Sequence, residues 1–169
     1  MVAPLPTLVR PATRVADEVW IAAALLHREN PDREAYTIDE IVDRARREKV
    51  HSSLRPGVRV HAALHCVANR EPNPARLRML YATGKNTRRL WRPGDPAHAL
   101  RKGKSLPDRR EIPVKYHKLL DWYASDYVQQ ASSNCGWLAG VLSLQGAGRE
   151  IWAGQDPDEY VRMLREGWD

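Results

Sequence analysis

The chain has 169 residues, of which 43% are hydrophobic and 28% are charged. This composition is typical of one globular domain, or of a small domain with an extension, and it excludes a disordered chain. No apolar run reaches the about 18 residues of a membrane-spanning helix. The start lacks the pattern of a signal peptide, and Cys66 and Cys135 form no CxxC pair. These features predict a reduced, cytoplasmic protein that does not enter a membrane.

Charge is distributed unevenly along the chain, whose formal net charge is +6. Residues 70–118 contain 14 Lys and Arg against 4 Asp and Glu, whereas residues 121–169 contain 3 against 8. A basic segment attracts a polyanion such as DNA by releasing counterions. The change of sign suggests a second, different partner for the end of the chain. A solvated, arginine-rich surface is the alternative explanation of the basic segment.

The first half of the chain is predicted to be helical after an extended lead at residues 1–12. A first helix is expected at residues 13–28, because apolar residues recur there with helical spacing. A second helix begins at Thr37, where Thr37 and Glu40 fit a capping box, and it ends near Lys49.

A third helix is predicted at residues 56–69 and a hairpin at 78–92, with its turn at 84–86. On a 100° helical wheel, the inward face of the third helix carries Val60, Ala63, Leu64 and Val67. The outward face carries Arg55, Val58, Ala62, His65 and Asn69. Three helices followed by a basic hairpin are typical of a winged helix.

The predicted fold is therefore mainly α with a small β-hairpin wing: a winged helix-turn-helix at residues 13–95 plus a C-terminal helical extension. In such a domain the third helix enters the major groove and the wing lies along the DNA backbone. A basic linker at 96–111, a helix at 112–130 and an acidic tail at 131–169 complete the expected organisation. The tail is expected to end in a helix that begins near Asp156.

Ten residues on the third helix, the wing and the linker are predicted to contact double-stranded DNA. Arginine pairs well with guanine and asparagine with adenine, whereas wing and linker cations suit phosphates. The alternative for each is an ordinary solvated or half-buried side chain. The ten are Arg55, Arg59, His65, Asn69, Lys85, Arg88, Arg89, Arg92, Arg101 and Lys102.

The sequence does not predict an enzyme, a cofactor or a metal site. It has no phosphate-binding glycine loop and no spacing that pairs a nucleophile with a base. His61 and His65 could share a helix face and bind zinc, but no further ligand completes a site. Cys66 is expected to be a small packed residue. Stacking on unpaired bases is an alternative to core packing for Tyr81, Trp91, Trp122 and Tyr123.

Several motifs resemble a prokaryotic winged-helix family related to the HARE-type helix-turn-helix domains of restriction systems and chromatin proteins. The motifs are VRVH at 58–61, HCVAN at 65–69, PNP at 72–74, RMLYATG at 78–84 and RRLWRPGD at 88–95. Residues 112–127, with LLDWY at 119–123, are similar to the helix that follows this domain in the family. The resemblance implies a winged helix that binds DNA.

The end of the chain resembles the C-terminal tail of bacterial type II antitoxins, in GAGREIW at 146–152 and DPDEYVRMLREGW at 156–168. Such tails wrap a toxin, often a PIN-domain ribonuclease. The resemblance implies a partner-binding face, although the tail could instead fold back on the protein's own basic region. The residues of this face are Trp152, Tyr160, Val161, Leu164, Arg165 and Trp168.

The leading hypothesis is a DNA-binding transcriptional regulator, the antitoxin of a toxin–antitoxin pair. Two alternatives remain: a winged helix that serves as a protein-interaction module, and a DNA-targeting module of a restriction-type defence system. The predicted helix at 112–130 could also pair two chains into a homodimer.

Overall fold

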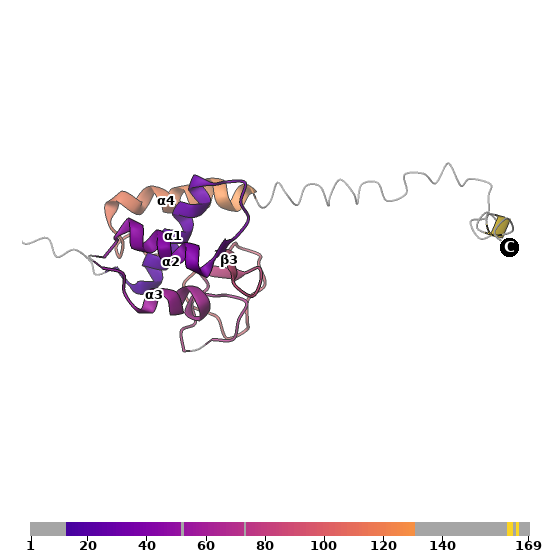
Figure 1. Cartoon of the computed structure of the whole chain (residues 1–169), viewed down its shortest axis with the longest axis horizontal. Helices are drawn as coiled ribbons and strands as arrows, with labels where there is room; N and C mark the ends of the chain where they lie inside the picture. Colours follow the sequence, from indigo (N-terminus) through magenta and orange to yellow (C-terminus); the bar gives the residue numbers. More distant parts are fainter. Residues whose placement is uncertain (1–12, 52, 73, 131–161, 164, 166–169) are drawn as a thin grey trace, which may run out of the picture. The chain divides into compact units, whose positions relative to one another are not determined.

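The computed structural model describes residues 13–51, 53–72 and 74–130, and residues 162, 163 and 165 (Figure 1). The chain divides into two compact units, Met1–Gln129 and Gln130–Asp169. In the second unit the described residues, Gln130, Arg162, Met163 and Arg165, have helical backbone and are exposed. The first unit is mainly α-helical with a three-stranded antiparallel sheet, which confirms the predicted class at this level. Its elements are α1 (Val15–Glu29), β1 (Tyr36–Thr37), α2 (Ile38–Glu48), α3 (Gly57–Val60), the π-helix η1 (His61–His65), β2 (Leu80–Ala82), β3 (Thr87–Leu90), the 3-10 helix η2 (Val114–Tyr116), α4 (His117–Trp122) and the π-helix η3 (Tyr123–Tyr127).

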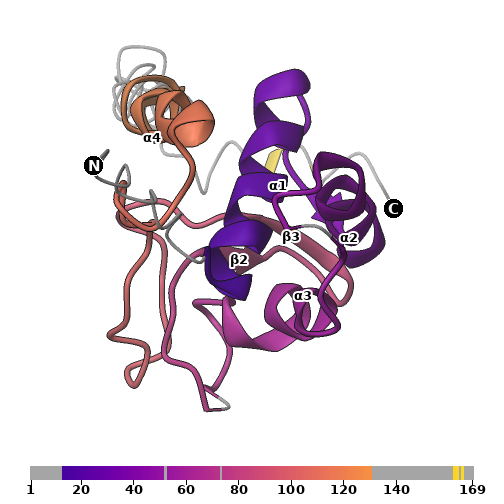
Figure 2. The ribbon, with the colours of Figure 1, turned by 90° about the vertical axis from the view of Figure 1, so that its left-hand side faces the viewer.

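Helix α1 lies at the centre of the first unit, between α4 on one side and α2 and α3 on the other (Figure 2). Its whole middle stretch, residues 16–24, is buried, including the charged Asp17 and Glu18. A helix that is buried on all sides needs several neighbours to cover it, and this one contacts α2, α3, β3 and α4. Apolar as it is, neither α1 nor another helix of the described residues is long and apolar enough to cross a membrane.

Helix α2 begins and ends as the sequence predicts. The Thr37 hydroxyl accepts a hydrogen bond from the Glu40 backbone N–H at 3.2 Å, and the Glu40 carboxylate accepts one from the Thr37 backbone N–H at 2.8 Å. This capping box satisfies N–H groups that a helix leaves free at its start. The helix ends at Lys49, whose backbone is left-handed with φ of 51°. Local sequence is therefore sufficient to set both ends of α2.

The third helix, formed by α3 and η1, is shorter than predicted and turns a different face to the core. It ends at His65, not at residue 69. Val58 and Ala62 are fully buried, although the helical wheel places them outward. Val60 and Leu64, expected to point inward, are 44% and 39% exposed. The 100° wheel groups Val58 with Ala62 and Val60 with Leu64 correctly, but α1 and α2 pack against the third helix with Val58 and Ala62 in the core, so the choice of inward side was wrong.

The predicted β-hairpin forms, with strands shorter than expected. Tyr81 of β2 lies opposite Arg89 of β3 in an antiparallel register. The sequence missed β1, a strand of two residues whose Tyr36 lies opposite Arg88, on the other edge of β3. Two residues are too few for an alternating pattern, so only the pairing partner reveals this strand.

The segment at 96–111, predicted to be a basic linker, contains no helix or strand and is hydrogen-bonded to the loop before β2. The Gly103 N–H donates to the Arg76 carbonyl at 2.8 Å, and the Lys104 carbonyl accepts from the Arg78 N–H at 3.0 Å. A Cβ atom on Gly103 would lie 2.6 Å from the Arg76 oxygen, so this close approach requires glycine. The segment is a fixed part of the first unit.

The helix predicted at 112–130 forms in three stretches, η2, α4 and η3. Leu119, Tyr123 and Tyr127 are buried. The ring of Tyr123 meets Trp20 edge-on, with centroids 5.8 Å apart. Edge-to-face aromatic pairs add stabilisation beyond the burial of their area, so this contact fastens the segment to α1.

His27, near the end of α1, is buried between two tyrosine rings. Its ring centroid lies 4.9 Å from that of Tyr36 and 5.0 Å from that of Tyr127. Burial, assisted by the positive charge of Arg92, lowers the pKa of His27 from 6.5 to about 3. The imidazole is therefore neutral in the folded protein at neutral pH.

We expect His27 to make the protein sensitive to acid. The unfolded chain takes up a proton at His27 near pH 6.5, whereas the folded protein takes it up near pH 3. Its contribution to stability is therefore complete above pH 6.5 and declines as the pH falls toward 3, by up to about 1.4 kcal/mol per pH unit. Urea unfolding of His27→Phe, which keeps an aromatic ring, should show this one-proton slope removed. A variant whose stability falls with pH as steeply as that of the wild type would contradict this account.

Candidate nucleic-acid interface

The ten residues predicted to contact DNA fall into three groups in the structure. Three arginines are buried: Arg88, Arg89 and Arg101, with 1%, 9% and 2% exposure. Two side chains, those of Arg55 and Asn69, are engaged inside the protein. The remaining five are exposed or half-buried: Arg59, Lys85, Lys102, His65 and Arg92. Only this last group contains exposed side chains, those of Arg59, Lys85 and Lys102.

Arg88 fastens the turn of the hairpin to the third helix. Its Nη1 donates to the carbonyls of Gly84 and Thr87 at 3.1 and 2.8 Å, and its Nη2 donates to that of Ala63 at 3.1 Å. Burial, with the like charge of Arg70, lowers the pKa of Arg88 to about 10. The prediction of a phosphate contact is therefore corrected: the buried guanidinium of Arg88 holds the hairpin turn against the third helix.

Arg101 has a similar role in the segment that follows the sheet. Its guanidinium donates to backbone carbonyls at the end of η1 and in the loop before β2. A helix leaves its last carbonyls without helical partners, so Arg101 caps η1 while it holds the loop. The prediction that Arg101 contacts DNA is therefore corrected: its guanidinium is buried. The acceptors are Leu64 (2.8 Å), His65 (2.6 Å), Arg70 (2.9 Å), Glu71 (3.1 Å), Ala75 (3.0 Å) and Leu77 (3.1 Å).

Arg89 and Arg92 are tied to neighbouring side chains. Arg89 forms a two-pronged ion pair with Asp95, with nitrogen–oxygen distances of 2.6 and 2.7 Å, and its guanidinium carbon lies 4.5 Å from the Tyr81 ring centroid. Arg92 lies over the Tyr127 ring at 4.4 Å. A bidentate pair has a fixed geometry, so Arg89 is withdrawn from the surface, whereas half-buried Arg92 keeps partial access to it.

Arg55, expected to approach base edges, instead neutralises a buried carboxylate. Its Nη2 lies 2.8 Å from Oε2 of Glu18, and its Nε donates to the same oxygen at 2.9 Å. The Glu18 side chain is 1% exposed and that of Arg55 is 23% exposed. A buried charge without a partner is strongly destabilising. The role of Arg55 is therefore to stabilise the start of the third helix against α1.

Asn69 completes the outer edge of β2. Its Nδ2 donates to the Ala82 carbonyl at 3.0 Å, and its Oδ1 accepts from the Ala82 N–H at 2.9 Å. The side-chain amide thus reproduces the pair of hydrogen bonds that a neighbouring strand would make. The donor and the acceptor that adenine would need are both occupied in this arrangement.

We expect Asn69→Asp to lower the free energy of unfolding by about 1 to 3 kcal/mol, because a carboxylate cannot donate to the Ala82 carbonyl. Asn86→Asp, in the exposed hairpin turn, is the matched control and should change stability by less than about 0.5 kcal/mol. Urea unfolding at neutral pH measures both. If Asn69→Asp weakened DNA binding at unchanged stability, the base-contact role would be restored.

The exposed side of the third helix and the hairpin turn together form the candidate interface, which we define as Arg59, Val60, Leu64, Arg70 and Lys85. Arg59 is exposed and pairs with Asp39 of α2 at 2.5 Å. Lys85 is exposed at the turn of the hairpin, and Arg70 donates to its carbonyl at 3.5 Å. Sequence reasoning missed Arg70 and assigned Val60 and Leu64 to the core. The sequence shows that Val60 and Leu64 lie on one side of the helix, but not whether that side faces the core or the solvent.

His61 and His65 face each other with ring centroids 4.9 Å apart. His61 Nδ1 donates to the Gly57 carbonyl at 2.9 Å, and burial lowers the pKa of His61. Within the described part of the chain, no group of three or more His, Cys, Asp or Glu could hold a metal ion.

Burial raises the pKa of the Cys66 thiol to about 12, so Cys66 stays protonated and packs as a small apolar residue.

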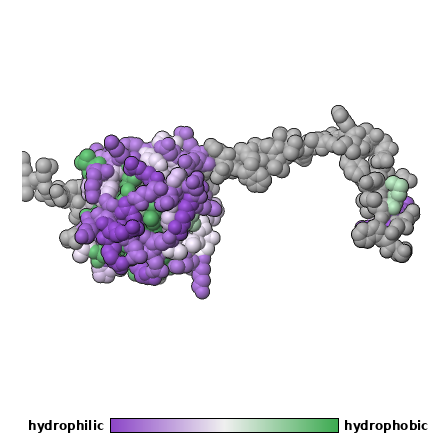
Figure 3. Space-filling view, turned by 45° about the horizontal axis from the view of Figure 1, so that its top comes forward, coloured by the Kyte–Doolittle hydropathy of each residue, from purple (hydrophilic) through white to green (hydrophobic). Residues whose placement is uncertain are grey.

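The surface is less basic than the sequence suggests. Three of the 14 basic residues at 70–118 are buried, and Lys104 lies 2.8 Å from Asp17 and 2.7 Å from Glu111. One face of the first unit is largely hydrophilic with separate hydrophobic spots (Figure 3). Lys102 remains exposed on the segment at 96–111. Any direct contact with a polyanion therefore comes from fewer cations than the 14 basic residues of this segment.

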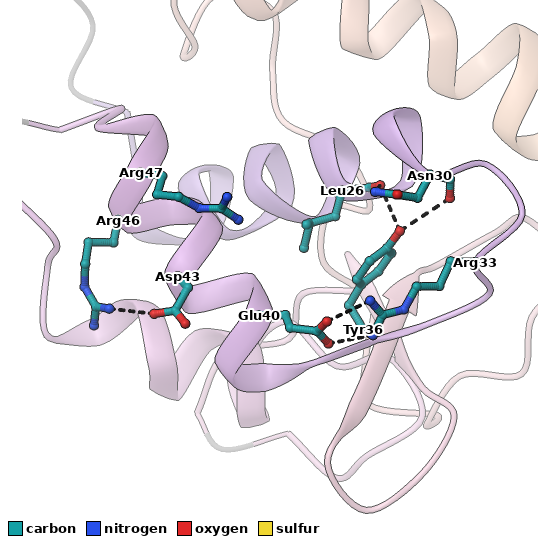
Figure 4. A pocket seen from close by; sticks show the side chains of 8 residues that line it. All are labelled: Leu26, Asn30, Arg33, Tyr36, Glu40, Asp43, Arg46 and Arg47. Carbon is teal, nitrogen blue, oxygen red and sulfur yellow. Dashed lines mark hydrogen bonds and ion pairs between the residues drawn. The ribbon is translucent and has the colours of Figure 1, made fainter.

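An open pocket of about 470 Å³ lies between the end of α1, β1 and α2 (Figure 4). Within it Arg33 pairs with Glu40 at 2.7 Å, and Arg46 pairs with Asp43 at 2.5 Å. The Tyr36 hydroxyl donates to the Leu26 carbonyl at 2.9 Å. Two of the three arginines that line the pocket are thus paired with its two carboxylates, with Arg47 as the third, and no ligand class is indicated.

The residues expected to bind a partner belong to the second unit. Arg165 is exposed on helical backbone. The other five lie outside the described residues: Trp152, Tyr160, Val161, Leu164 and Trp168.

No protein family, curated protein or solved structure matches this chain significantly. The function must therefore be argued from the residues of the candidate interface.

Proposed function

We propose that this chain binds double-stranded DNA through the candidate interface, as a winged helix-turn-helix. The observation that carries the proposal is the bond set of Arg88, which joins the carbonyls of Ala63 in the third helix and Gly84 in the hairpin turn. The exposed residues of both elements therefore lie near one another. In winged helices the third helix enters the major groove and the hairpin lies along the backbone.

The order of the elements supports this reading of the fold. A short strand between the first two helices pairs with the hairpin that follows the third helix, in the order β1-β3-β2. The arrangement leaves one side of the third helix uncovered, where Val60 and Leu64 are exposed. An uncovered helix beside a hairpin turn is the shape that a major groove admits.

The proposed contacts divide by chemistry. Lys85, Arg70 and Lys102 carry flexible or half-exposed cations that suit phosphate oxygens, which supply affinity without sequence choice. Arg59, on the third helix, suits a guanine edge or a phosphate once it leaves Asp39. Arg92 and His65 are half-buried and are secondary candidates.

A binding titration on the DNA upstream of the chain's own gene, across a salt series, tests the proposal. We expect Lys85→Glu to weaken binding and to reduce the slope of log affinity against log salt by about 1. Lys118→Glu is the matched control, since Lys118 is exposed on α4, which lies across α1 from the third helix (Figure 2). Binding that is absent, or that does not respond to salt, would refute the proposal.

A second candidate function is a protein-interaction module. The observation that favours it is the exposure of Val60 and Leu64 on the third helix, whereas Arg88, Arg89 and Arg101, which were expected at the surface, are buried. If Lys85→Glu abolished DNA binding while the cellular activity survived, this second function would replace the first.

We also propose that the protein acts as a transcriptional regulator with a protein partner at its acidic end, as the antitoxin resemblance implies. The charge of residues 121–169 supports this proposal, with 8 acidic against 3 basic residues. Purification of the full chain from its native cell under mild conditions tests it. Stoichiometric recovery of a small nuclease would support the antitoxin role, and recovery of the chain alone would count against it.

A further inference from the structure

The exposed side of the third helix combines apolar side chains with a single strong hydrogen-bond donor. Val60 and Leu64 are 44% and 39% exposed, and their spacing of four residues places them on one side of the helix. Single exposed apolar residues are common on protein surfaces. An exposed apolar pair on the helix that faces the proposed ligand suggests that the ligand covers it.

The polar groups near this side are mostly engaged or buried. The Nδ1 atom of His61 is bonded to the Gly57 carbonyl, and the Nδ1 atom of His65 is buried without a hydrogen-bond partner. Asn69 is committed to β2. Arg59 alone, among the described residues of α3 and η1, offers an exposed guanidinium. The helix therefore has little capacity to read bases through hydrogen bonds.

The charges that flank the apolar pair match a nucleic-acid occupant. Arg59 directly precedes Val60, and Lys85 and Arg70 lie at the hairpin turn, which Arg88 holds to Ala63 beside Leu64. Cations on both sides would meet the two phosphate backbones that border a groove. An apolar strip between them would then face the base edges.

We propose that Val60 and Leu64 read the 5-methyl groups of thymine in the major groove. The thymine methyl is the apolar group that base pairs present there, and contact with aliphatic side chains is its usual mode of recognition. This inference rests on the proposed DNA binding and names what the third helix selects. Sequence preference comes from apolar contact with thymine, with Arg59 adding at most one polar contact.

Substitution of uracil for thymine removes these methyl groups and keeps the Watson–Crick pairs. A random-sequence duplex pool is first enriched on the full-length protein, and the best-enriched duplex is then made once with thymine and once with uracil. Each buried methyl contributes roughly a fourfold gain in affinity. We expect the uracil duplex to bind roughly 16-fold more weakly than the thymine duplex, through loss of two such contacts.

Matched variants assign the effect to the helix. Val60→Asn should bring the thymine-to-uracil ratio of affinities toward that of a single methyl contact, whereas Val114→Asn should leave the ratio unchanged, since Val114 is exposed on η2 outside the candidate interface. Thermal unfolding confirms that both variants are folded. Equal binding of the two duplexes by the wild type, or a wild-type ratio in Val60→Asn, would overturn the inference while DNA binding stands. If no duplex is enriched, the proposed function itself fails. A protein partner whose binding is lost in Val60→Asn would then support the interaction module.

Discussion

Replacing Arg101 with methionine should lower the free energy of unfolding by about 4 kcal/mol, because several buried carbonyls lose their donor at once. Arg101 is 2% exposed and bonds carbonyls at the end of η1 and in the loop before β2. Arg101→Lys should recover less than half of the loss, since an ammonium has three donors and lacks the planar fork. Urea unfolding of the full chain measures both variants.

The control for Arg101 is Arg110→Met, an exposed arginine in the segment that leads to η2. It should change stability by less than about 0.5 kcal/mol. Should Arg101→Met be as stable as this control and lose only DNA affinity, Arg101 would be a surface contact after all. If Arg101→Met does not fold, hydrogen exchange of Arg101→Lys should show weaker protection in η1 and the loop than elsewhere in the first unit.

The second large effect is expected at the ion pair between Arg55 and Glu18. Arg55→Met should lower the free energy of unfolding by about 3 to 5 kcal/mol, because it leaves the buried Glu18 carboxylate without a partner. The double variant Glu18→Gln/Arg55→Met removes the buried charge as well. The free energy of unfolding of the double variant should lie within about 1 to 2 kcal/mol of the wild-type value. The losses of the single variants Glu18→Gln and Arg55→Met should therefore not add.

Arg46→Met provides the comparison for an exposed pair. Arg46 and Asp43 are 60% and 58% exposed at the side chain, and such a pair contributes at most about 0.5 kcal/mol. The cycle also tests function, since Arg55→Met should bind DNA as tightly as the wild type under conditions where it is folded. Additive losses in the cycle, or a DNA defect without instability, would place Arg55 at the interface.

The roles of the arginines separate what sequence can and cannot predict. Arg59 and Lys85 were predicted to be accessible and are exposed, whereas Arg88 and Arg101 were predicted to be accessible and are buried. Lys85, Arg88 and Arg101 share one sequence context, the basic segment at 70–118 with few acidic residues. The difference arises because carbonyls of distant segments converge on the two buried guanidinium groups, at separations of 24 to 37 residues in the chain. No local pattern records such convergence.

The candidate interface shows the same division. The third helix and the hairpin were both expected, because apolar spacing and turn residues are local signals. The side of the third helix that was predicted to face solvent was wrong, because both sides carry apolar residues four apart, and the packing against α1 and α2 decides which of them is buried. Val60 and Leu64 therefore became candidate contacts only once the backbone was known.

The sequence by itself determined the elements whose ends depend on neighbouring residues. It placed α2 through the capping box of Thr37 and Glu40, and it placed the hairpin through the turn at 84–86. Only the tertiary structure decided that β1 exists, that the segment at 96–111 is fixed, and which cations remain at the surface. The physical reason is range: caps and turns are satisfied within a few residues, whereas strand pairing and the burial of a guanidinium depend on groups far away in the chain.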